Sequence, residues 1–309
     1  MLYTVLGNAL PGKWWIDNMF AYLILHYKNA DVTEQCIESL LKHDMEDSCI
    51  IVVDNASDNG SYESLSEKYG NNDIIHFLHN EKNLGYAAGN NVGFRYGKDV
   101  LKAEWIVLLN NDVTIEQNDF KEVLLKEYEK NPFYIAGPNI VTPEGNNQNP
   151  FRMQCMDAGI IRKNLMHDYI VLALMRIKVQ QLLKKLLHYD GSIFKPNDID
   201  TIHDFHGVVH GSCIIFSPDF IREFDGLYNE TFLYCEEEIL CYILNKLGYP
   251  YSYLKSVTVT HRHSVSMKRE VKDEDRRKLI EISNRIVSYK KFLRIAKTEE
   301  NVGKYLKRE

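Results

Sequence analysis

The sequence CIIVVDNASDNG, residues 49–60, decides the fold class. Its first five residues are an apolar run that fits a buried β-strand, and the seven that follow break the strand at once with polar and small side chains. Residues 33–42 before it have apolar residues near helical spacing, and residues 61–69 after it also look helical. The segment is therefore expected to be a strand between two helices.

The same alternation continues on both sides of this segment. Residues 22–27, 74–78 and 105–109 are further apolar runs that fit buried strands, and the Gly- and Asn-rich residues 83–93 lead into a helix. Strands that alternate with helices at this spacing indicate an α/β fold with a Rossmann-like, mostly parallel central sheet and helices on both faces. In such sheets ligands bind beyond the carboxyl ends of the strands.

The second half of the chain is less regular. Its expected strands are residues 211–216 and 257–260, and its expected helices are residues 165–187, 218–224, 236–247 and 275–293.

Composition limits the class of protein. The chain has 309 residues, 45% hydrophobic and 26% charged, which is typical of a soluble globular protein. The net charge of -6 argues against a broad nucleic-acid-binding surface. Six cysteines without a CxxC pair are expected to be reduced thiols in a cytosolic protein. No apolar run reaches the roughly 18 residues that span a bilayer, and residues 1–20 lack the pattern of a secretory signal.

Three polar clusters each follow a predicted strand. They are Asp54 with Asn55, the loop at residues 83–93, and residues 110–112. Because the carboxyl ends of parallel strands share one edge, we expect these clusters to converge on one crevice. The glycines and alanines of the loop allow close approach of the backbone to a ligand, and the following helix start can face phosphate. A purely structural loop is the alternative.

Asn110 and Asp112 are candidate ligands of a hard divalent cation, Mg²⁺ or Mn²⁺, which keeps open positions for phosphate oxygens. A single aspartate is a thin metal site, so a further ligand is needed. His261 directly follows a predicted strand, and a neutral imidazole can bind Mn²⁺. The alternatives are a strand-ending turn at residues 110–112 and an ordinary hydrogen-bonded histidine at position 261.

Glu236, Glu237 and Glu238 open a predicted helix. The helix dipole favours acidic residues at this end, but one or two suffice and three in a row repel one another. A carboxylate in a cleft can also act as a general base that takes the proton from an attacking hydroxyl.

The ordered set of motifs resembles the family 2 glycosyltransferases, specifically the bacterial branch of rhamnosyl- and galactofuranosyl-transferases of cell-surface polysaccharides. The resemblance covers about residues 21–266. In family order the matching pieces are VVDNAS (52–57), NLGYAAGNNVG (83–93), LLNND (108–112), HGSCIIF (210–216), FDGLYNETFLYCEE (224–237) and His261 before Ser264-Val265-Ser266, with a weaker echo in Ser283-Asn284-Arg285.

The resemblance implies a GT-A fold and an inverting, single-displacement transfer. The donor would be a UDP- or dTDP-sugar, and the acceptor a saccharide or polyprenyl-linked saccharide of the cell envelope. Glu237 matches the catalytic position, with Glu236 beside it as the alternative. Asp112, aided by Asn110 and His261, would hold the metal on the diphosphate. The implied donor-binding residues are Asp54 and Asn55 at the base and ribose, and Asn83, Gly85, Asn90, Asn91 and Asn111 in the rest of the donor pocket.

The same resemblance divides the chain. We expect an N-terminal arm (1–20), a nucleotide-sugar-binding half (21–150), an acceptor-binding, catalytic half (151–270) and a C-terminal helical tail (271–309).

Three departures from the family pattern concern the metal and the substrates. Asn110 replaces the more usual aspartate, so weaker metal affinity is expected, and Glu236-Glu237 replaces the usual Glu-Asp pair. Ile239 and Ile243 stand where an acidic residue and an arginine often follow.

The expected helix at residues 165–187 is apolar on more than one face and carries four basic residues, Arg176, Lys178, Lys184 and Lys185. Because acceptors of this family are often lipid-linked, one hypothesis is peripheral contact with the inner face of the cell membrane. Packing on the domain or on a second subunit is the alternative.

Two other function classes remain open. A sugar nucleotidyltransferase would carry a basic Gly-rich signature near its first strand, which residues 22–29 lack. A catalytically inactive nucleotide-sugar-binding protein is the other alternative, made plausible by Asn110 and by the Glu-Glu pair.

Overall fold

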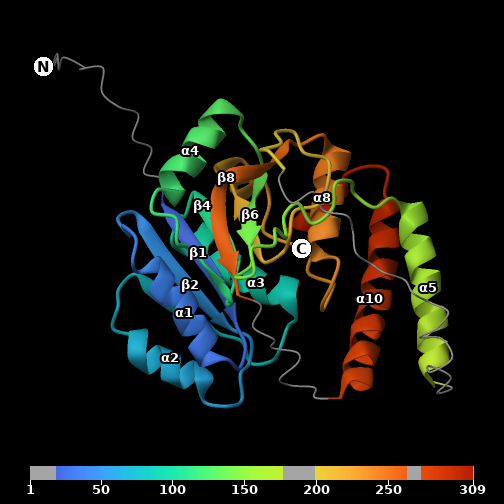
Figure 1. The fold of residues 1–309 in the computed structure, drawn as a ribbon, viewed down its shortest axis with the longest axis horizontal. Helices are drawn as coiled ribbons and strands as arrows, with labels where there is room; N and C mark the ends of the chain where they lie inside the picture. The colour runs from blue at the N-terminus through green and yellow to red at the C-terminus, as the bar shows by residue number, and fades with distance from the viewer. Residues whose placement is uncertain (1–18, 177–198, 263–272, 309) are drawn as a thin grey trace, which may run out of the picture.

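The computed structural model describes residues 19–176, 199–262 and 273–308. The strands are β1 (Phe20–His26), β2 (Ser48–Asp54), β3 (Ile75–His79), β4 (Trp105–Asn110), β5 (Val113–Thr114), β6 (Ile135–Val141), β7 (Cys213–Phe216) and β8 (Tyr251–His261). They form one eight-stranded sheet in the order β3-β2-β1-β4-β7-β6-β8-β5 (Figure 1). Strands β5 and β7 run antiparallel to the other six, so the predicted mostly parallel α/β sheet is confirmed.

The helical segments that cover the sheet and extend beyond it are α1 (Ala30–Leu40), α2 (Ser61–Tyr69), α3 (Tyr86–Arg95), η1 (Tyr96–Val100), α4 (Phe120–Lys130), α5 (Ala158–Arg176), α7 (Pro218–Glu223), α8 (Glu236–Leu247), α10 (Glu274–Ala296) and η2 (Val302–Leu306). Helices α2 and α8 have the bounds that the sequence predicts. Helix α4 and strands β5 and β6 were not predicted.

Side chains along a strand alternate between the two faces of the sheet. Both faces are buried under helices. In β1, Ala21 and Leu23 belong to the core under α3, α7 and α8. Phe20, Tyr22 and Ile24 belong to the core under α1, α2 and α4. This double burial explains why the strands are continuous apolar runs in the sequence.

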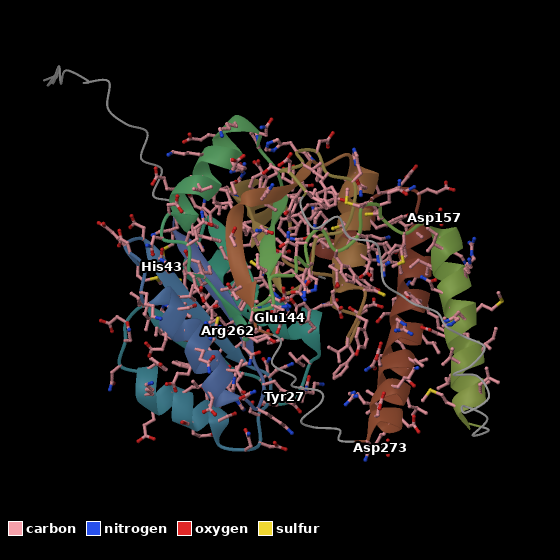
Figure 2. All side chains as sticks on the ribbon, in the orientation of Figure 1. Tyr27, His43, Glu144, Asp157, Arg262 and Asp273 are labelled. Atoms are coloured by element: carbon pink, nitrogen blue, oxygen red, sulfur yellow. The ribbon has the colours of Figure 1, made fainter. Side chains whose placement is uncertain are left out.

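The carboxyl ends of the six parallel strands lie along one edge of the sheet. The register pairs His26 with Asp54 and Leu25 with Asn110. Since β7 runs the other way, its beginning lies at this edge, and the Asn110 N–H donates to the Ser212 carbonyl at 2.9 Å. Figure 2 labels Tyr27 and Arg262, which follow β1 and β8, near this edge. The predicted polar clusters therefore share one side of the molecule.

Helices α5 and α10 form a pair outside the sheet, with α5 outermost (Figure 1). Met175 packs against Ile282 and Ile286. The Arg285 guanidinium donates two hydrogen bonds, of 2.6 and 2.7 Å, to the buried carboxylate of Asp168. The pair is thus fixed by a small apolar core and one bidentate ion pair.

Helix α5 begins at Ala158, seven residues before the predicted start, because the Asp157 carboxylate accepts the Ile160 N–H at 2.8 Å and caps the first turn. The predicted end at residues 177–187 lies outside the described residues, as do residues 1–18 of the expected arm and residues 264–266. Among the described helices, none combines the length and apolar character needed to cross a membrane.

Candidate functional site

Asp54 ends β2 and is fully buried. Its carboxylate accepts the Ser57 N–H and lies 2.8 Å from Nδ1 of His79. His26, also fully buried, lies 3.9 Å from Asp54 Oδ1. Burial lowers the pKa of His26 to about 4, against the opposing charge of Asp54, so this imidazole is neutral near pH 7.

His26 links the ends of β2 and β4. Its Nδ1 lies 2.7 Å from the hydroxyl of Thr33, which also accepts a 3.0 Å hydrogen bond from the Asn111 amide. Asn111 therefore points toward α1. Sequence reasoning missed His26, although a histidine ending an otherwise apolar strand was a usable signal.

Asn55 organises the loop that precedes α3. Its amide nitrogen donates to Asn83 Oδ1 (3.0 Å) and to the Gly85 carbonyl (3.1 Å). Its amide oxygen accepts the Leu84 N–H at 3.0 Å and the Asn80 amide at 3.3 Å. The side chain is buried, and its donor and acceptor groups hold the chain itself. The predicted contact of Asn55 with the nucleotide stays a prediction.

Gly85 brings the loop against a second segment of the site. Its φ of +83° and ψ of -174° lie in a region that is almost exclusive to glycine. A Cβ here would lie 2.3 Å from the Phe232 carbonyl oxygen, which accepts the Tyr86 N–H at 2.8 Å. The Tyr86 hydroxyl donates to the Gly211 carbonyl at 2.5 Å. The loop is thereby attached to the segments that precede α8 and β7.

The two asparagines of α3 have different surroundings. The Asn91 amide donates to the Leu227 carbonyl at 2.7 Å and accepts the Leu227 N–H at 2.8 Å. Asn90 donates to the Tyr86 carbonyl, and within the described residues its buried Oδ1 has no hydrogen-bond partner. Asn90 therefore has an unused acceptor, whereas Asn91 fixes the chain before α8.

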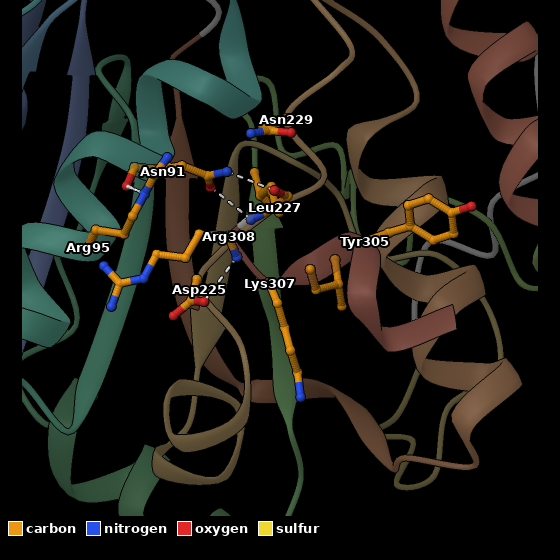
Figure 3. A pocket seen from close by; sticks show the side chains of 9 residues that line it. Asn91, Arg95, Asp225, Leu227, Asn229, Tyr305, Lys307 and Arg308 are labelled. Atoms are coloured by element: carbon orange, nitrogen blue, oxygen red, sulfur yellow. Dashed lines mark hydrogen bonds between the residues drawn. The ribbon is translucent and has the colours of Figure 1, made fainter. Parts of the chain in front are cut away.

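Asn91 also lines a pocket between the end of α3 and the C-terminal segment (Figure 3). The other residues of this pocket are Arg95, Asp225, Leu227, Asn229, Tyr305, Leu306, Lys307 and Arg308. Apart from Asn91, none was predicted as a site residue.

Asp112 and His261 meet at the polar edge. Oδ1 of Asp112 lies 3.1 Å from Nε2 of His261, and each side chain is only 9% exposed. The backbone supports the approach, since Val113 pairs with His261 and the Arg262 N–H donates to the Asp112 carbonyl. A pocket opens beside Asp112, and its other lining residues are Val32, Gln35, Asn111, Thr114 and Arg262.

The chemistry of this pair fits a divalent cation. Nδ1 of His261 lies 2.6 Å from Gln148 Oε1, an acceptor; the tautomer with the proton on Nδ1 would turn the Nε2 lone pair toward the Asp112 carboxylate. A cation between the two atoms would stabilise that arrangement, and a hydrogen bond on the other ring nitrogen is typical of metal-binding histidines. No cluster of three His, Cys, Asp or Glu suited to a metal occurs among the described residues. Phosphate oxygens and water commonly complete such sites.

Glu237 approaches the same edge from α8. Tyr234 and Cys235, just before the helix, have φ of +73° and +70°, an uncommon conformation for such side chains. The carboxylate of Glu237 lies against Gly211, 3.5 to 3.7 Å from where a Cβ of that residue would stand. Glu237 is partly exposed, whereas Glu236 and Glu238 are buried.

Burial raises the proton affinity of all three glutamates. It raises the pKa of Glu237 well above 4.5, and the charges of Glu238 and Glu236 add to this effect. Burial likewise raises the pKa of Glu236 to about 7 and the pKa of Glu238 above its usual value. A carboxylate with a raised pKa is a stronger base near neutral pH.

His210 connects the two parts of the site. Its ring centroid lies 5.8 Å from that of His261 and 5.4 Å from that of Phe151. The next residue, Gly211, lies beside the Glu237 carboxylate, which a Cβ at position 211 would meet at 3.5 Å. A short path therefore runs from Asp112 through His261 and His210 to Glu237. His210 begins the motif HGSCIIF, but no role was predicted for it, and Gln148 was not among the predicted residues.

Comparisons with known proteins agree with this fold. The chain is 26% identical to the low-salt glycan biosynthesis hexosyltransferase Agl10 of Haloferax volcanii over 269 residues, 87% of this chain and 75% of that protein. It is 23% identical to the glycosyltransferase GlyG of Streptococcus pneumoniae over 122 residues, 40% of this chain and 39% of that protein.

Two solved structures share the fold. GalNAc-T7 with UDP, GalNAc and Mn²⁺ superposes with a TM-score of 0.56 at 12% identity, over 79% of this chain and 44% of that chain. S. aureus TarS 1–349 in complex with UDP superposes with a TM-score of 0.51 at 12% identity, over 93% and 68%. The chain has the GT-A fold of these glycosyltransferases. The model of the family "Glycosyl transferase family 2" matches residues 23–199, more than half of the sequence. The chain therefore belongs to glycosyltransferase family 2.

Proposed function

We propose that this glycosyltransferase moves a hexosyl or deoxyhexosyl group from a nucleotide diphosphate sugar to a saccharide acceptor, with inversion and with Glu237 as the catalytic base. The observation that carries the proposal is the short path from Glu237 through Gly211 and His210 to the pair of Asp112 and His261. In this arrangement the Glu237 carboxylate would serve the acceptor, and the pair of Asp112 and His261 would hold a cation at the donor.

In the proposed reaction the acceptor hydroxyl donates a hydrogen bond to Glu237. As its oxygen bonds to the anomeric carbon, the proton passes to Glu237, and the bond from that carbon to the donor phosphate breaks on the opposite face. Burial is the largest cause of the raised pKa of Glu237, and a raised pKa suits a base that must hold this proton. A divalent cation bound by Asp112 and His261, with Asn110 beside them, would supply charge neutralisation for the departing diphosphate.

For the donor we propose contacts from the polar edge. Asp54 and Asn55 would lie at the base and ribose, and Asn90 would contribute its unused buried Oδ1. Asn83, Gly85, Asn91 and Asn111 would shape the donor pocket, the three amides being engaged with the chain itself. Because the GalNAc-T7 and TarS structures contain UDP, UDP-sugars come first among the candidate donors, ahead of dTDP-sugars. The rhamnosyl- or galactofuranosyl-transferase branch stays a prediction.

The central test measures release of nucleoside diphosphate from a panel of nucleotide sugars with and without Mn²⁺. We expect metal-dependent release that Glu237→Gln nearly abolishes, while the exposed control Glu129→Gln keeps full activity. NMR of the product bond should show the anomeric configuration opposite to that of the donor. Full activity of Glu237→Gln would remove it as the base, and Glu236 would be tested next. No release with any donor or metal would favour the inactive binding protein.

We also propose that the acceptor is lipid-linked and that the protein contacts the inner face of the cell membrane through α5. The outer side of this helix exposes apolar side chains, including Met166 (62% exposed) and Ile170 (51% exposed). The charged residues exposed on the same helix, Arg162 and Lys163, are basic, which suits anionic lipids. In the sequence, residues 177–187 follow this helix and carry three lysines, Lys178, Lys184 and Lys185.

The membrane proposal is tested by flotation with vesicles in which about a third of the lipid is anionic phosphatidylglycerol. The wild type should float, and Met166→Glu with Ile170→Glu should not. The matched change Val100→Glu, at a residue 60% exposed on η1, should have no effect. A wild type that stays in the lower fraction would refute membrane contact, and a dimer broken by the α5 changes would indicate a second subunit instead.

A further inference from the structure

The segment around Glu237 contains more charge than one catalytic base requires. Glu238 is 5% exposed, and the guanidinium of Arg152 lies beside it, with Nε 3.6 Å from Glu238 Oε1. Within the described residues, Glu238 Oε2 has no hydrogen-bond partner. A buried carboxylate with so little hydrogen bonding costs stability. Arg152 and Glu238 therefore call for an explanation beyond packing.

Arg152 is held in place by its backbone. Its N–H donates to the Val208 carbonyl and its carbonyl accepts the Val208 N–H, at 3.2 and 2.8 Å. The guanidinium lies 5.1 Å from the ring centroid of Phe151, whose ring also contacts His210. The cation thus comes from the loop after β6 and meets α8 at the residue next to Glu237.

The position of Glu238 in the helix separates it from the reaction. Consecutive residues of an α-helix point about 100° apart, and Glu237 lies against Gly211 while Glu238 faces Arg152. Glu238 therefore acts on Glu237 through charge. The negative charge of Glu238 raises the pKa of Glu237, and the positive charge of Arg152 lowers it.

The other ionisable groups near Glu237 do not reproduce the opposing charges of Arg152 and Glu238. Glu236 adds a like charge from the same helix. Tyr86 from α3, and Cys235 and Cys241 from the α8 segment, also lie within electrostatic reach, but burial raises the pKa of each well above its usual value, so they stay neutral. The positive charge of Arg152 opposes these like charges and lowers the pKa of Glu237.

We propose that Arg152 and Glu238 are a pair of positioning residues that sets the pH range in which Glu237 accepts the proton of the acceptor hydroxyl. The inference rests on the proposed role of Glu237 as base. It assigns to Glu238 a function in addition to the roles considered for Glu236 and Glu237.

The test is the pH dependence of kcat/KM, measured as nucleoside diphosphate release at saturating Mn²⁺. Glu238→Gln removes a like charge, so the acidic limb of the profile should move to lower pH by roughly one unit. Arg152→Gln removes the opposite charge, so the limb should move to higher pH by about the same amount. Burial and, to a smaller extent, the charge of Glu238 raise the pKa of Glu236 to about 7, so a contribution of Glu236 to the profile would shift in the same direction.

Three controls separate charge from structure. Arg152→Lys keeps the cation and should keep the limb of the wild type. The surface changes Asp204→Asn and Arg222→Gln match the two chemical substitutions, at side chains 72% and 69% exposed, and should shift nothing. The double variant Arg152→Gln with Glu238→Gln should return the limb towards the wild-type position, and it leaves no buried charge unpaired if the single Arg152 variant folds poorly.

Opposite shifts in the two single variants would support the pair. Shifts in the same direction, or unchanged limbs, would overturn the inference. If Glu237→Gln is inactive while the two limbs stay in place, this inference fails and the proposed base stands. If Glu237→Gln is fully active, the proposed base itself fails.

Discussion

Replacing Gly85 by alanine should separate the donor loop from the catalytic segment. The new Cβ would meet the Phe232 carbonyl oxygen at 2.3 Å and its Cα at 2.8 Å, and both are backbone atoms that cannot rotate away. The backbone at φ +83°, ψ -174° adds strain of about 1–3 kcal/mol for any residue with a side chain. Moving Phe232 away would break the hydrogen bond from the Tyr86 N–H, worth about 1 kcal/mol.

The sum is about 2–4 kcal/mol, less than the roughly 5–15 kcal/mol stability of a typical domain. Gly85→Ala should therefore fold, but with a lower free energy of unfolding. Guanidinium denaturation monitored by far-UV circular dichroism would measure this loss. Because Phe232 is only five residues from Glu237, kcat/KM for nucleoside diphosphate release should fall at least about tenfold, close to 1.4 kcal/mol of barrier.

Gly248→Ala is the matched control. Gly248 has φ +71°, but a Cβ there would have no heavy atom within 4 Å. Its cost should be the backbone strain alone, about 1–2 kcal/mol, without loss of activity. If Gly85→Ala were as active as Gly248→Ala, the close approach to Phe232 would not position the catalytic segment, and the reasoning would be refuted.

Three further predictions concern the cation site, pH and the helical pair. Asp112→Ala should abolish Mn²⁺-dependent activity and weaken Mn²⁺ binding followed by electron paramagnetic resonance, and unchanged binding would exclude Asp112 from the site. Since the folded pKa of His26 is about 4, only the unfolded chain takes up its proton between about pH 6.5 and 4. Stability should therefore fall by up to about 3 kcal/mol as the pH drops through this range, and His26→Gln should lack this part of the pH dependence in denaturation curves. Arg285→Met leaves the buried Asp168 carboxylate unpaired and should cost about 3–5 kcal/mol, whereas Arg285→Met with Asp168→Leu should recover much of it; equal losses in both would contradict the ion-pair explanation.

The first half of the fold could be predicted from the sequence, because buried parallel strands give unbroken apolar runs and β1 to β4 each end at polar residues. Strand β6 could not, because its sequence IAGPNIV contains Gly137-Pro138, which is typical of a turn. In the structure these residues stay in the strand beside a register irregularity between Pro138 and Asn139. Helix α4, by contrast, has apolar positions such as Phe120 and Leu124 at helical spacing, and that signal was available.

For the site, motif order led to Asp112 and His261, which meet at the polar edge, and to Glu237, whose carboxylate lies beside Gly211. Their partners were not predictable, because Gln148 and Arg152 come from irregular segments with no pattern of their own, and only the folded chain brings them to His261 and Glu238. The sequence also could not tell that the amides of Asn55 and Asn91 are occupied by the chain itself. An asparagine that binds a ligand and one that binds a neighbouring loop look alike in sequence.

Because helix α10 follows every strand of the sheet in sequence, the sheet can form during synthesis before this helix is available. The Ser288 hydroxyl of this helix donates to the Leu233 carbonyl at 2.9 Å, four residues from Glu237, and Arg285 neutralises Asp168 of α5. Both contacts come from residues that are synthesised after every strand of the sheet. Until residues 285–288 leave the ribosome, Asp168 lacks this guanidinium and the segment before Glu237 lacks its support, so the nascent protein can complete its sheet before it acquires a finished catalytic centre.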